Sequence, residues 1–401
     1  MSAYFSFLKQ NFRAVFFGWI LTFFSSFGQT FLISLYVPFL LADLEMSKGV
    51  FGGYYAAATI IASGLLLRFG HLVDEQRIKS LTSRVIILLA IACVLLAVAW
   101  HPVVLFFAMI GLRLGGQGLM THISLSVMSR RFDADRGKAL SISSLGYSMS
   151  EMILPVVFGG IIALSHWRVA AGSSVGVLIA LLVLLPYFRT ERMDMSREAA
   201  DKNAALKGKR KFYRDMVSSK KFWIIASSSL GTGFTVTGFF FYQFVMANEK
   251  GWPVEIYTAA FTGYGLVRLL FSVYGGTLTD RLSAVKLFPW MLVPVTLGVF
   301  SLAVGEGLIA AVIFLFGTGI TMGLVGVVKT AALAEVYGIE SIGKVRSLFS
   351  VVAVFSTAIS PMIFGILLDQ GITFEAIAAG CTVILLLGIT SATQIGRYRL
   401  S

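Results

Sequence analysis

Long apolar stretches recur along the whole chain and are separated by short polar segments. Each stretch is free or nearly free of charge and long enough to cross a hydrocarbon core, which takes roughly 17 to 25 helical residues. Such stretches indicate membrane-spanning helices. They predict twelve, approximately over residues 14–42, 49–67, 81–100, 103–127, 139–163, 169–188, 222–247, 256–278, 287–305, 307–333, 347–368 and 372–395.

Composition supports this interpretation. The 401 residues are 57% hydrophobic and only 13% charged, whereas soluble domains use about 45 to 50% apolar residues. We therefore expect an all-α, multi-pass membrane protein. The first apolar run is much longer than the apolar core of a signal peptide, so it predicts an uncleaved first helix. Cys93 and Cys381 lie inside apolar spans without the spacing of a metal site, and we expect no metal and no cofactor.

The net charge of +13 raises the question of whether the protein binds nucleic acid. However, 27 of the 33 Lys and Arg lie before the first span, after the last, or in loops on one side of the predicted bundle. This distribution is the positive-inside pattern and predicts that both termini are cytoplasmic. No basic soluble domain is available for nucleic acid. The charge therefore reports topology, with attraction to anionic lipid as a secondary effect.

The chain contains an internal repeat with an offset of 206 residues. This offset aligns Gly70, Leu72 and Asp74 with equivalent residues at 276, 278 and 280, and it gives nine identities between positions 137 and 159. One constant offset over two separate regions indicates duplicated halves of six spans each. We predict an N-terminal half over 1–188, a cytoplasmic linker over 189–221 and a C-terminal half over 222–401. Parallel repeats of this kind place a substrate site near the middle of the membrane.

Two loops carry a resemblance to a known family. GHLVDEQRIKS (70–80) and GTLTDRLS (276–283) resemble the G-x-L-x-D-R-x-G-R loop of the major facilitator superfamily, and RLGGQG (113–118) resembles its R-x-x-Q-G motif in the fourth span. The resemblance covers nearly the whole chain and implies that fold, with alternating-access transport. The loop at 130–138 and the fifth span resemble bacterial carboxylate-type members, which implies the inner membrane of a bacterial cell.

An Asp beside a tight turn can accept hydrogen bonds from a neighbouring helix N-terminus and so latch two helices in one conformation. This reasoning makes the two signature loops candidates for gating. The gating candidates are Gly70, Asp74, Gly276, Asp280 and Arg281.

Four ionisable residues lie deep within predicted spans: Arg113, Glu151, Arg268 and Lys329. A charge left in lipid costs at least about 2.5 kcal/mol, so these side chains should face the protein interior or water. Arg268 is twelve residues, roughly 18 Å, from the cytoplasmic end of its span. The planar guanidinium suits a carboxylate, and the carboxylate branch of the family also has an Arg in the eighth span. Its monocarboxylate members place an Asp four residues earlier, where this chain has Tyr264, so proton coupling by that Asp is not carried over.

Alternatives remain for each of these charges. For Arg268 the alternatives are binding of the substrate anion, an ion pair with Glu151, and a purely structural role. Arg113 and Glu151 lie on consecutive spans; the alternatives for them are gating or proton coupling, contact with the substrate, and a static lock between the two. Lys329 either reaches the substrate or extends its stem towards the cytoplasmic interface.

Uncharged polar side chains within the spans complete the candidate site, since such groups orient a ligand in a mostly apolar pocket. His122 is a second candidate for proton coupling, with packing as its alternative role. Glycine strings such as GTGITMGLVG (317–326) predict close helix packing. The remaining substrate candidates are Gln29, Tyr36, Gln117, Tyr242 and Gln243.

These features favour a secondary transporter and not an enzyme, because no nucleophile elbow, zinc motif or Walker lysine is present. Its expected partners are a small organic anion of monocarboxylate type, protons and the lipid bilayer, with Arg268 holding the carboxylate and Glu151 carrying the proton. We expect a monomer and no nucleic acid. Proton-driven export of amphipathic or hydrophobic compounds is the alternative function, and a sensor on a transporter scaffold is a third.

Overall fold

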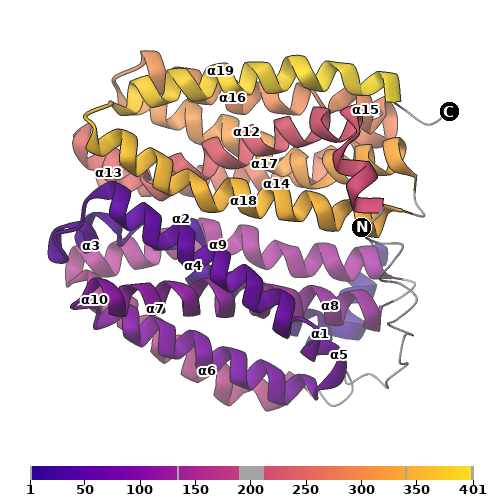
Figure 1. Cartoon of the computed structure of the whole chain (residues 1–401). Coiled ribbons are helices and arrows are strands. Elements are labelled where there is room, and N and C mark those ends of the chain that lie inside the picture. The colour runs from indigo at the N-terminus through magenta and orange to yellow at the C-terminus, as the bar shows by residue number, and fades with distance from the viewer. Residues whose placement is uncertain (1, 133–134, 189–211, 339–340, 399–401) are drawn as a thin grey trace. The chain divides into compact units, whose positions relative to one another are not determined.

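The computed structural model describes residues 2–132, 135–188, 212–338 and 341–398 (Figure 1). Within these residues the regular structure is helical, and no strand occurs. Eleven helices are long and apolar enough to cross a membrane, which confirms an all-α membrane protein. Much of the predicted linker, 189–211, lies outside the described residues.

The first predicted span is a broken helix. Helix α1 (Ser2–Phe24) is followed by a 3₁₀ turn, η1 (Ser25–Gly28), and then by two short helices, α2 (Thr30–Ile33) and α3 (Val37–Asp43). Gln29 between them has an extended backbone, with φ of −90° and ψ of 150°. The break explains why eleven continuous spans are present where the hydropathy pattern predicts twelve.

The chain divides into two compact units. Unit 1 comprises Met1–Arg197 together with Phe240–Val245, and unit 2 comprises Glu198–Phe239 together with Met246–Ser401. A short stretch of the seventh span therefore packs with the first unit.

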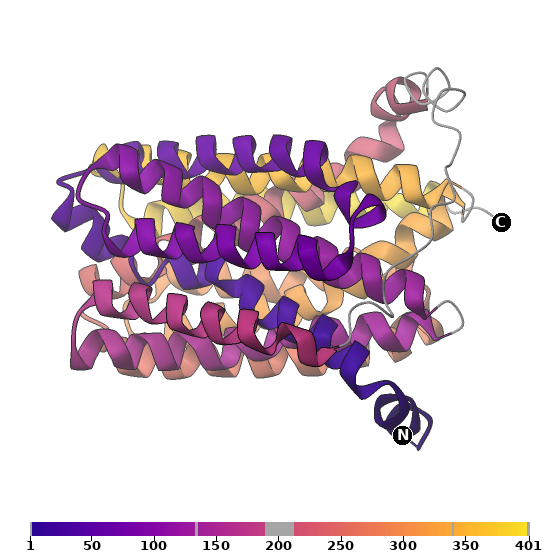
Figure 2. The same cartoon turned by 90° about the horizontal axis from the view of Figure 1, so that it is seen from below.

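Unit 1 contains long helices that run alongside one another, drawn from indigo to magenta in Figures 1 and 2. Helix α1 packs along α9, and α6 packs along both α7 and α10. The fourth predicted span has a π-helical centre, η2, between two α-helical ends. The remaining elements are α4 (Lys48–Phe69), α5 (Leu72–Glu75), α6 (Ile78–Ala97), α7 (Pro102–Leu112), η2 (Arg113–Met120), α8 (Thr121–Arg131), α9 (Arg136–Leu164), α10 (Trp167–Leu184) and η3 (Leu185–Phe188).

In unit 2, α14 packs along α17, α17 along α16, and α16 along α19. A Cβ added to Gly323 of α17 would lie 2.5 Å from the carbonyl oxygen of Arg268, and one on Gly319 would lie 2.9 Å from that of Tyr264. The glycines thus allow close approach of α14 and α17, which confirms the packing role predicted for that string. The elements are α12 (Lys220–Phe241), α13 (Gln243–Glu249, which starts within unit 1), α14 (Val254–Leu282), α15 (Ala284–Leu287), η5 (Trp290–Leu292), α16 (Val293–Val304), α17 (Leu308–Tyr337), α18 (Ile342–Asp369), α19 (Phe374–Ala392) and η6 (Thr393–Tyr398).

Candidate functional site

Two irregular helical segments cross in unit 1 with their backbones in direct contact. A Cβ added to Gly28 of η1 would lie 1.9 Å from the carbonyl oxygen of Leu112, and one added to Gly116 of η2 would lie 2.7 Å from the backbone nitrogen of Gly28. Only glycine fits such an approach. The crossing brings the break in the first span against the π-helical part of the fourth.

Arg113 lies at this crossing and is only 3% exposed. Its Nη1 donates a hydrogen bond to the carbonyl oxygen of Gly28 at 3.1 Å. Its Cζ lies 4.9 Å from the centre of the Tyr55 ring, a distance at which a cation is attracted to the ring face. Among the described residues, the Nε–H has no acceptor, and no carboxylate lies within 4.0 Å of the guanidinium. The positive charge is therefore buried without a carboxylate partner in unit 1.

Gln29 directly follows the glycine that receives this bond. It is 6% exposed, and its side-chain amide forms no hydrogen bond with the described residues. By contrast, the neighbouring Thr30 hydroxyl is bonded to the Tyr55 hydroxyl at 2.7 Å, which fixes the ring beneath Arg113. The crossing thus holds a rigid aromatic ring and two groups with unused hydrogen-bonding capacity, Arg113 and Gln29.

Glu151 lies in the middle of α9 and is 2% exposed. The preceding residue, Ser150, is hydrogen-bonded to Ser26 of η1 at 2.5 Å, so this part of α9 packs against the break in the first span. None of the ion pairs formed by the described residues involves Arg113, so the structure does not show the static lock between Arg113 and Glu151, which was one of the alternatives left open by the sequence. Gln117, four residues after Arg113, is half-buried and forms no hydrogen bond through its side chain with the described residues.

Three of the predicted polar residues have structural partners within unit 1. Gln243 donates from Nε2 to the Ser34 hydroxyl at 2.8 Å, and the Tyr242 hydroxyl donates to the carbonyl oxygen of Lys48 at 2.6 Å. The Tyr36 ring centre is 6.4 Å from that of Trp167, at the start of α10. The bonds of Gln243 and Tyr242 hold the short stretch 240–245 against the rest of unit 1.

The signature loop of unit 1 is tied to the end of the fourth span by two contacts. Asp74 forms an ion pair with Arg130 of α8. Nε2 of His122, also on α8, lies 3.0 Å from the carbonyl oxygen of Gly70. A carbonyl oxygen only accepts, so this bond places the hydrogen on Nε2. The Asp74 partner is thus an arginine side chain and not the helix N-terminus that sequence reasoning favoured, and Arg130 was missed because nothing in its local sequence marks it.

In unit 2, Arg268 is half-buried on α14, and its Nη1 lies 3.4 Å from the Tyr264 hydroxyl one turn earlier. Lys329 is half-buried on α17, where Nζ lies 5.5 Å from the centre of the Phe349 ring. Gly323 touches the backbone of Arg268, and Lys329 lies six residues, about 9 Å, further along the helix. The structure therefore brings Tyr264 to Arg268 but places Lys329 at a different depth.

The signature loop of unit 2 is connected to the neighbouring helix by different contacts, which we call its joint. Glu335, near the end of α17, accepts hydrogen bonds from the Ser283 hydroxyl at 2.7 Å and from the backbone N–H of Ala284 at 2.8 Å. Ser283 has a φ of 69°, which is uncommon for a residue other than glycine. The side chain of Asp280 lies outside the described residues, while Arg281 is exposed and Gly276 is half-buried. Glu335 was missed by sequence reasoning, although an acid at the end of an apolar span was a usable signal.

Comparisons with known proteins bear on the whole chain. A sequence-family model described as Major Facilitator Superfamily matches residues 18–261 and 230–393. Among curated protein sequences, none matches this chain.

Solved structures share the fold at low identity. A bacterial homolog of the human lysosomal transporter Spinster, in an inward-facing and unoccupied conformation, has a TM-score of 0.74 and 14% identity over 96% of this chain and 98% of its own. The nucleoside transporter NupG has a TM-score of 0.74 and 13% identity over 95% and 99%. The peptide transporter POT, bound to alafosfalin, has a TM-score of 0.72 and 16% identity over 97% and 95%.

Proposed function

The chain belongs to the Major Facilitator Superfamily and is a transporter, and on that premise we propose that it is a secondary active transporter of a small organic anion. The substrate class is a monocarboxylate, transport is coupled to protons, and the cycle is one of alternating access. We place the protein as a monomer in the inner membrane of a bacterial cell. The solved relatives are named for nucleosides, peptides and lysosomal transport, and this chain's own charged residues support the proposed substrate class.

The observation that carries the proposal is the state of Arg113. Its charge is buried, it has no carboxylate partner among the described residues, and its Nε–H lacks an acceptor. Leaving a donor of a charged group unbonded in the interior costs about 1 to 3 kcal/mol or more. A bound carboxylate would supply both the missing acceptor and the missing charge. The adjacent Gln29 amide would then orient the anion.

In unit 2, Arg268 is the candidate for contacting the anion, with the Tyr264 hydroxyl beside it. Lys329 is the weaker candidate because it lies at another depth and already faces the Phe349 ring. Gln117 is the remaining polar candidate in unit 1. We assign Tyr36, Tyr242 and Gln243 to holding the fold around the site.

Glu151 is our candidate for carrying the proton. Glu151 is buried in α9. Its carboxylate becomes neutral when it binds one proton, as a proton carrier requires. His122 has a structural partner in Gly70, so we assign it to the loop joint together with Asp74 and Arg130. This joint would latch one conformation of the transport cycle.

Transport in proteoliposomes tests the proposal. We expect uptake of radiolabelled acetate, lactate or pyruvate driven by an inward proton gradient, and a loss of at least about tenfold in Arg113→Gln, in keeping with a charge-assisted bond of 1.5 to 3 kcal/mol. Arg268→Gln should also reduce uptake. Glu151→Gln should abolish proton-driven uptake but keep exchange of labelled for unlabelled anion. Undiminished uptake by Arg113→Gln and Arg268→Gln would overturn the anion assignment.

The alternative function, export of amphipathic or hydrophobic compounds, is less well supported. An uncompensated buried guanidinium repels cationic amphiphiles. A drug-susceptibility panel in a strain lacking the protein separates the two functions, because only an exporter of such compounds changes the panel.

A further inference from the structure

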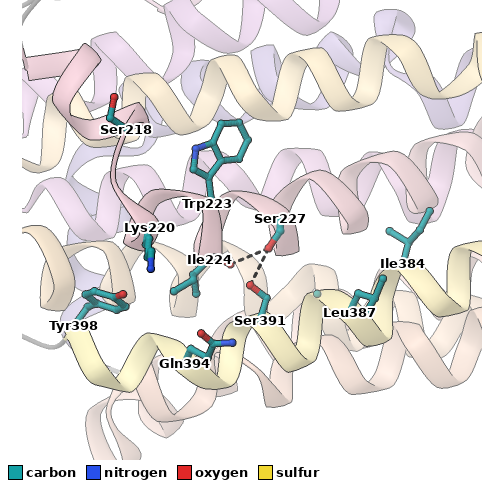
Figure 3. A pocket seen from close by; sticks show the side chains of 11 residues that line it. Ser218, Lys220, Trp223, Ile224, Ser227, Ile384, Leu387, Ser391, Gln394 and Tyr398 are labelled. Carbon is teal, nitrogen blue, oxygen red and sulfur yellow. Dashed lines mark hydrogen bonds between the residues drawn. The ribbon is translucent and has the colours of Figure 1, made fainter.

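A groove lies on the surface of unit 2 between the start of α12 and the end of α19 (Figure 3). Its volume is about 590 Å³, which is large enough for a small molecule or part of a lipid. It is lined by Ser218, Lys220, Trp223, Ile224, Ser227, Ile384, Leu387, Gly388, Ser391, Gln394 and Tyr398. None of these residues belongs to the proposed transport site.

The two ends of the groove differ in chemistry. Figure 3 shows Lys220 and Tyr398 at one end and Ile384 and Leu387 at the other. The apolar end extends along α19 from Ser391 to Ile384, seven residues or about 10 Å. The groove therefore changes from charged and polar to apolar in the direction that leads from the helix ends into the membrane.

The groove has a fixed floor and a fixed rim. Ser227 donates to Ser391 at 3.2 Å, and Ser228 donates to the carbonyl oxygen of Gly388 at 3.0 Å. These bonds join α12 to α19. At the rim, Trp223 is 52% exposed, yet its Nε1 donates to the carbonyl oxygen of Val217 at 2.8 Å, which holds the ring in place. A ligand would thus find the groove already formed.

The charge at the polar end is positive and available. Lys220 is exposed and forms no hydrogen bond or ion pair with the described residues, none of which contributes an Asp or Glu to the groove lining. This end lies where basic residues gather, on the predicted cytoplasmic side, whose leaflet carries anionic lipids. Trp and Tyr side chains are typical of that depth, at the boundary between headgroups and hydrocarbon.

We propose that this groove binds an anionic phospholipid of the cytoplasmic leaflet. Lys220 contacts the phosphate, the Tyr398 and Gln394 side chains contact the headgroup and glycerol region, and one acyl chain lies along Leu387 and Ile384. The proposal requires no conformational change and does not depend on the identity of the transported solute.

Unit 1 supplies an internal comparison. A second groove of about 310 Å³ lies between α6 and α10, and the described residues that line it are all apolar, among them Ile87, Ile91 and Ile179. An acyl chain fits there by hydrophobic contact alone, so this groove has no means of selecting a headgroup. We therefore expect the groove of unit 2 to select an anionic headgroup and the groove of unit 1 to bind acyl chains without regard to the headgroup.

Photolabelling in nanodiscs tests the proposal. The full chain is reconstituted in phosphatidylcholine with a trace of phospholipid that carries a photoreactive diazirine in one acyl chain, as phosphatidylglycerol or as phosphatidylcholine. Labelled peptides are then quantified by mass spectrometry. We expect the phosphatidylglycerol probe to label residues 384–391 about five times more than the phosphatidylcholine probe, because only the phosphatidylglycerol headgroup carries a net negative charge for Lys220 to attract; this factor corresponds to about 1 kcal/mol. Residues 86–95 should be labelled equally by the two probes.

Two variants make the test specific. Lys220→Gln should remove the preference at 384–391 and leave labelling at 86–95 unchanged, which also shows that the variant is folded. Lys286→Gln removes an equally exposed charge from α15, outside the groove, and should keep the preference. Equal labelling of 384–391 by the two probes, or an equal loss of preference in both variants, would overturn the proposal.

Discussion

The carboxylate of Glu335 accepts a hydrogen bond from the backbone N–H of Ala284 at 2.8 Å. A second bond comes from the Ser283 hydroxyl at 2.7 Å. One side chain at the end of α17 therefore caps the start of α15 and supports the unusual φ of Ser283. This joint connects the signature loop of unit 2 to the span that follows it.

The repeat offset of 206 shows that the two units make this joint differently. Ser129 is the repeat partner of Glu335, and Val336 is the repeat partner of Arg130. Unit 1 instead joins its loop to α8 by the ion pair between Asp74 and Arg130. The same connection thus rests on a partly buried cap in unit 2 and on a partly exposed charge pair in unit 1. The two joints should respond differently to substitution.

Glu335→Ala should destabilise the protein clearly. Ala284 is fully buried, so its N–H loses its acceptor at a cost of about 1 to 3 kcal/mol. Thermal unfolding of the purified protein measures the effect. Ser129→Ala, at the equivalent position of unit 1, is the matched control and should leave the unfolding temperature nearly unchanged. Equal unfolding temperatures for the two variants would show that the cap adds no stability.

The ion pair of unit 1 should affect transport more than stability. Its side chains are 45% and 37% exposed, and such pairs contribute about 0.2 to 1 kcal/mol. Asp74→Arg should alter the transport rate in proteoliposomes, and the swap Asp74→Arg with Arg130→Asp should restore it, since the attraction is re-formed. A swap that behaves like the sum of its single variants would exclude the pair as a latch.

Sequence reasoning predicts the helices well because lipid offers no partner for backbone groups, so a long apolar run must satisfy them as a helix. It does not predict the break at 25–29. Ser25, Ser26 and Gly28 hardly lower the hydropathy of the surrounding run, and the extended backbone of Gln29 follows from packing against the fourth span. The depth of a charged residue within a span can be predicted from the sequence. Its depth predicts that Arg113 is buried, and the structure confirms this.

The partner of that charge is not readable from sequence. Gly28 and Arg113 are 85 residues apart, and a backbone carbonyl carries no sequence signature. The sequence therefore offers Glu151, the acid nearest in the chain at similar depth, as a candidate partner for Arg113. In the structure the carbonyl oxygen of Gly28, at the helix break, accepts a hydrogen bond from Nη1 of Arg113, and the Nε–H has no acceptor among the described residues.

Gly28→Ala should disrupt unit 1. The added Cβ would overlap the carbonyl oxygen of Leu112 at 1.9 Å, which forces η1 away from η2 and costs about 3 kcal/mol or more. Yield of monodisperse protein and unfolding temperature should both fall. Gly53→Ala is the control, because its Cβ meets nothing within 4 Å and alanine favours the helix. Comparable behaviour of the two variants would contradict the close crossing.

Arg168→Lys should weaken the end of unit 1 opposite the signature loop. Arg168 donates to the carbonyl oxygens of Ala97 and Ala99 at 3.2 and 2.9 Å and to Asp43 at 3.0 Å. A lysine cannot match this planar set. We expect a loss of about 1 kcal/mol, discounted because the side chain is about one-third exposed. Thermal unfolding measures this loss of stability. An unfolding temperature equal to that of the wild type would show that a positive charge at position 168 is enough to stabilise this end of unit 1 without the planar set of hydrogen bonds.

Gln29→Leu separates binding from stability. The side chain is 6% exposed and its amide forms no hydrogen bond with the described residues, so replacing it with an apolar side chain of similar size removes no hydrogen bond within this part of the protein. The unfolding temperature without ligand should stay the same or rise. If the amide orients the transported anion, uptake should fall about five- to tenfold, as expected for one lost hydrogen bond of about 1 to 1.5 kcal/mol. A variant that is destabilised in proportion to its loss of uptake would instead make Gln29 a structural residue, and an unchanged uptake would remove it from the site.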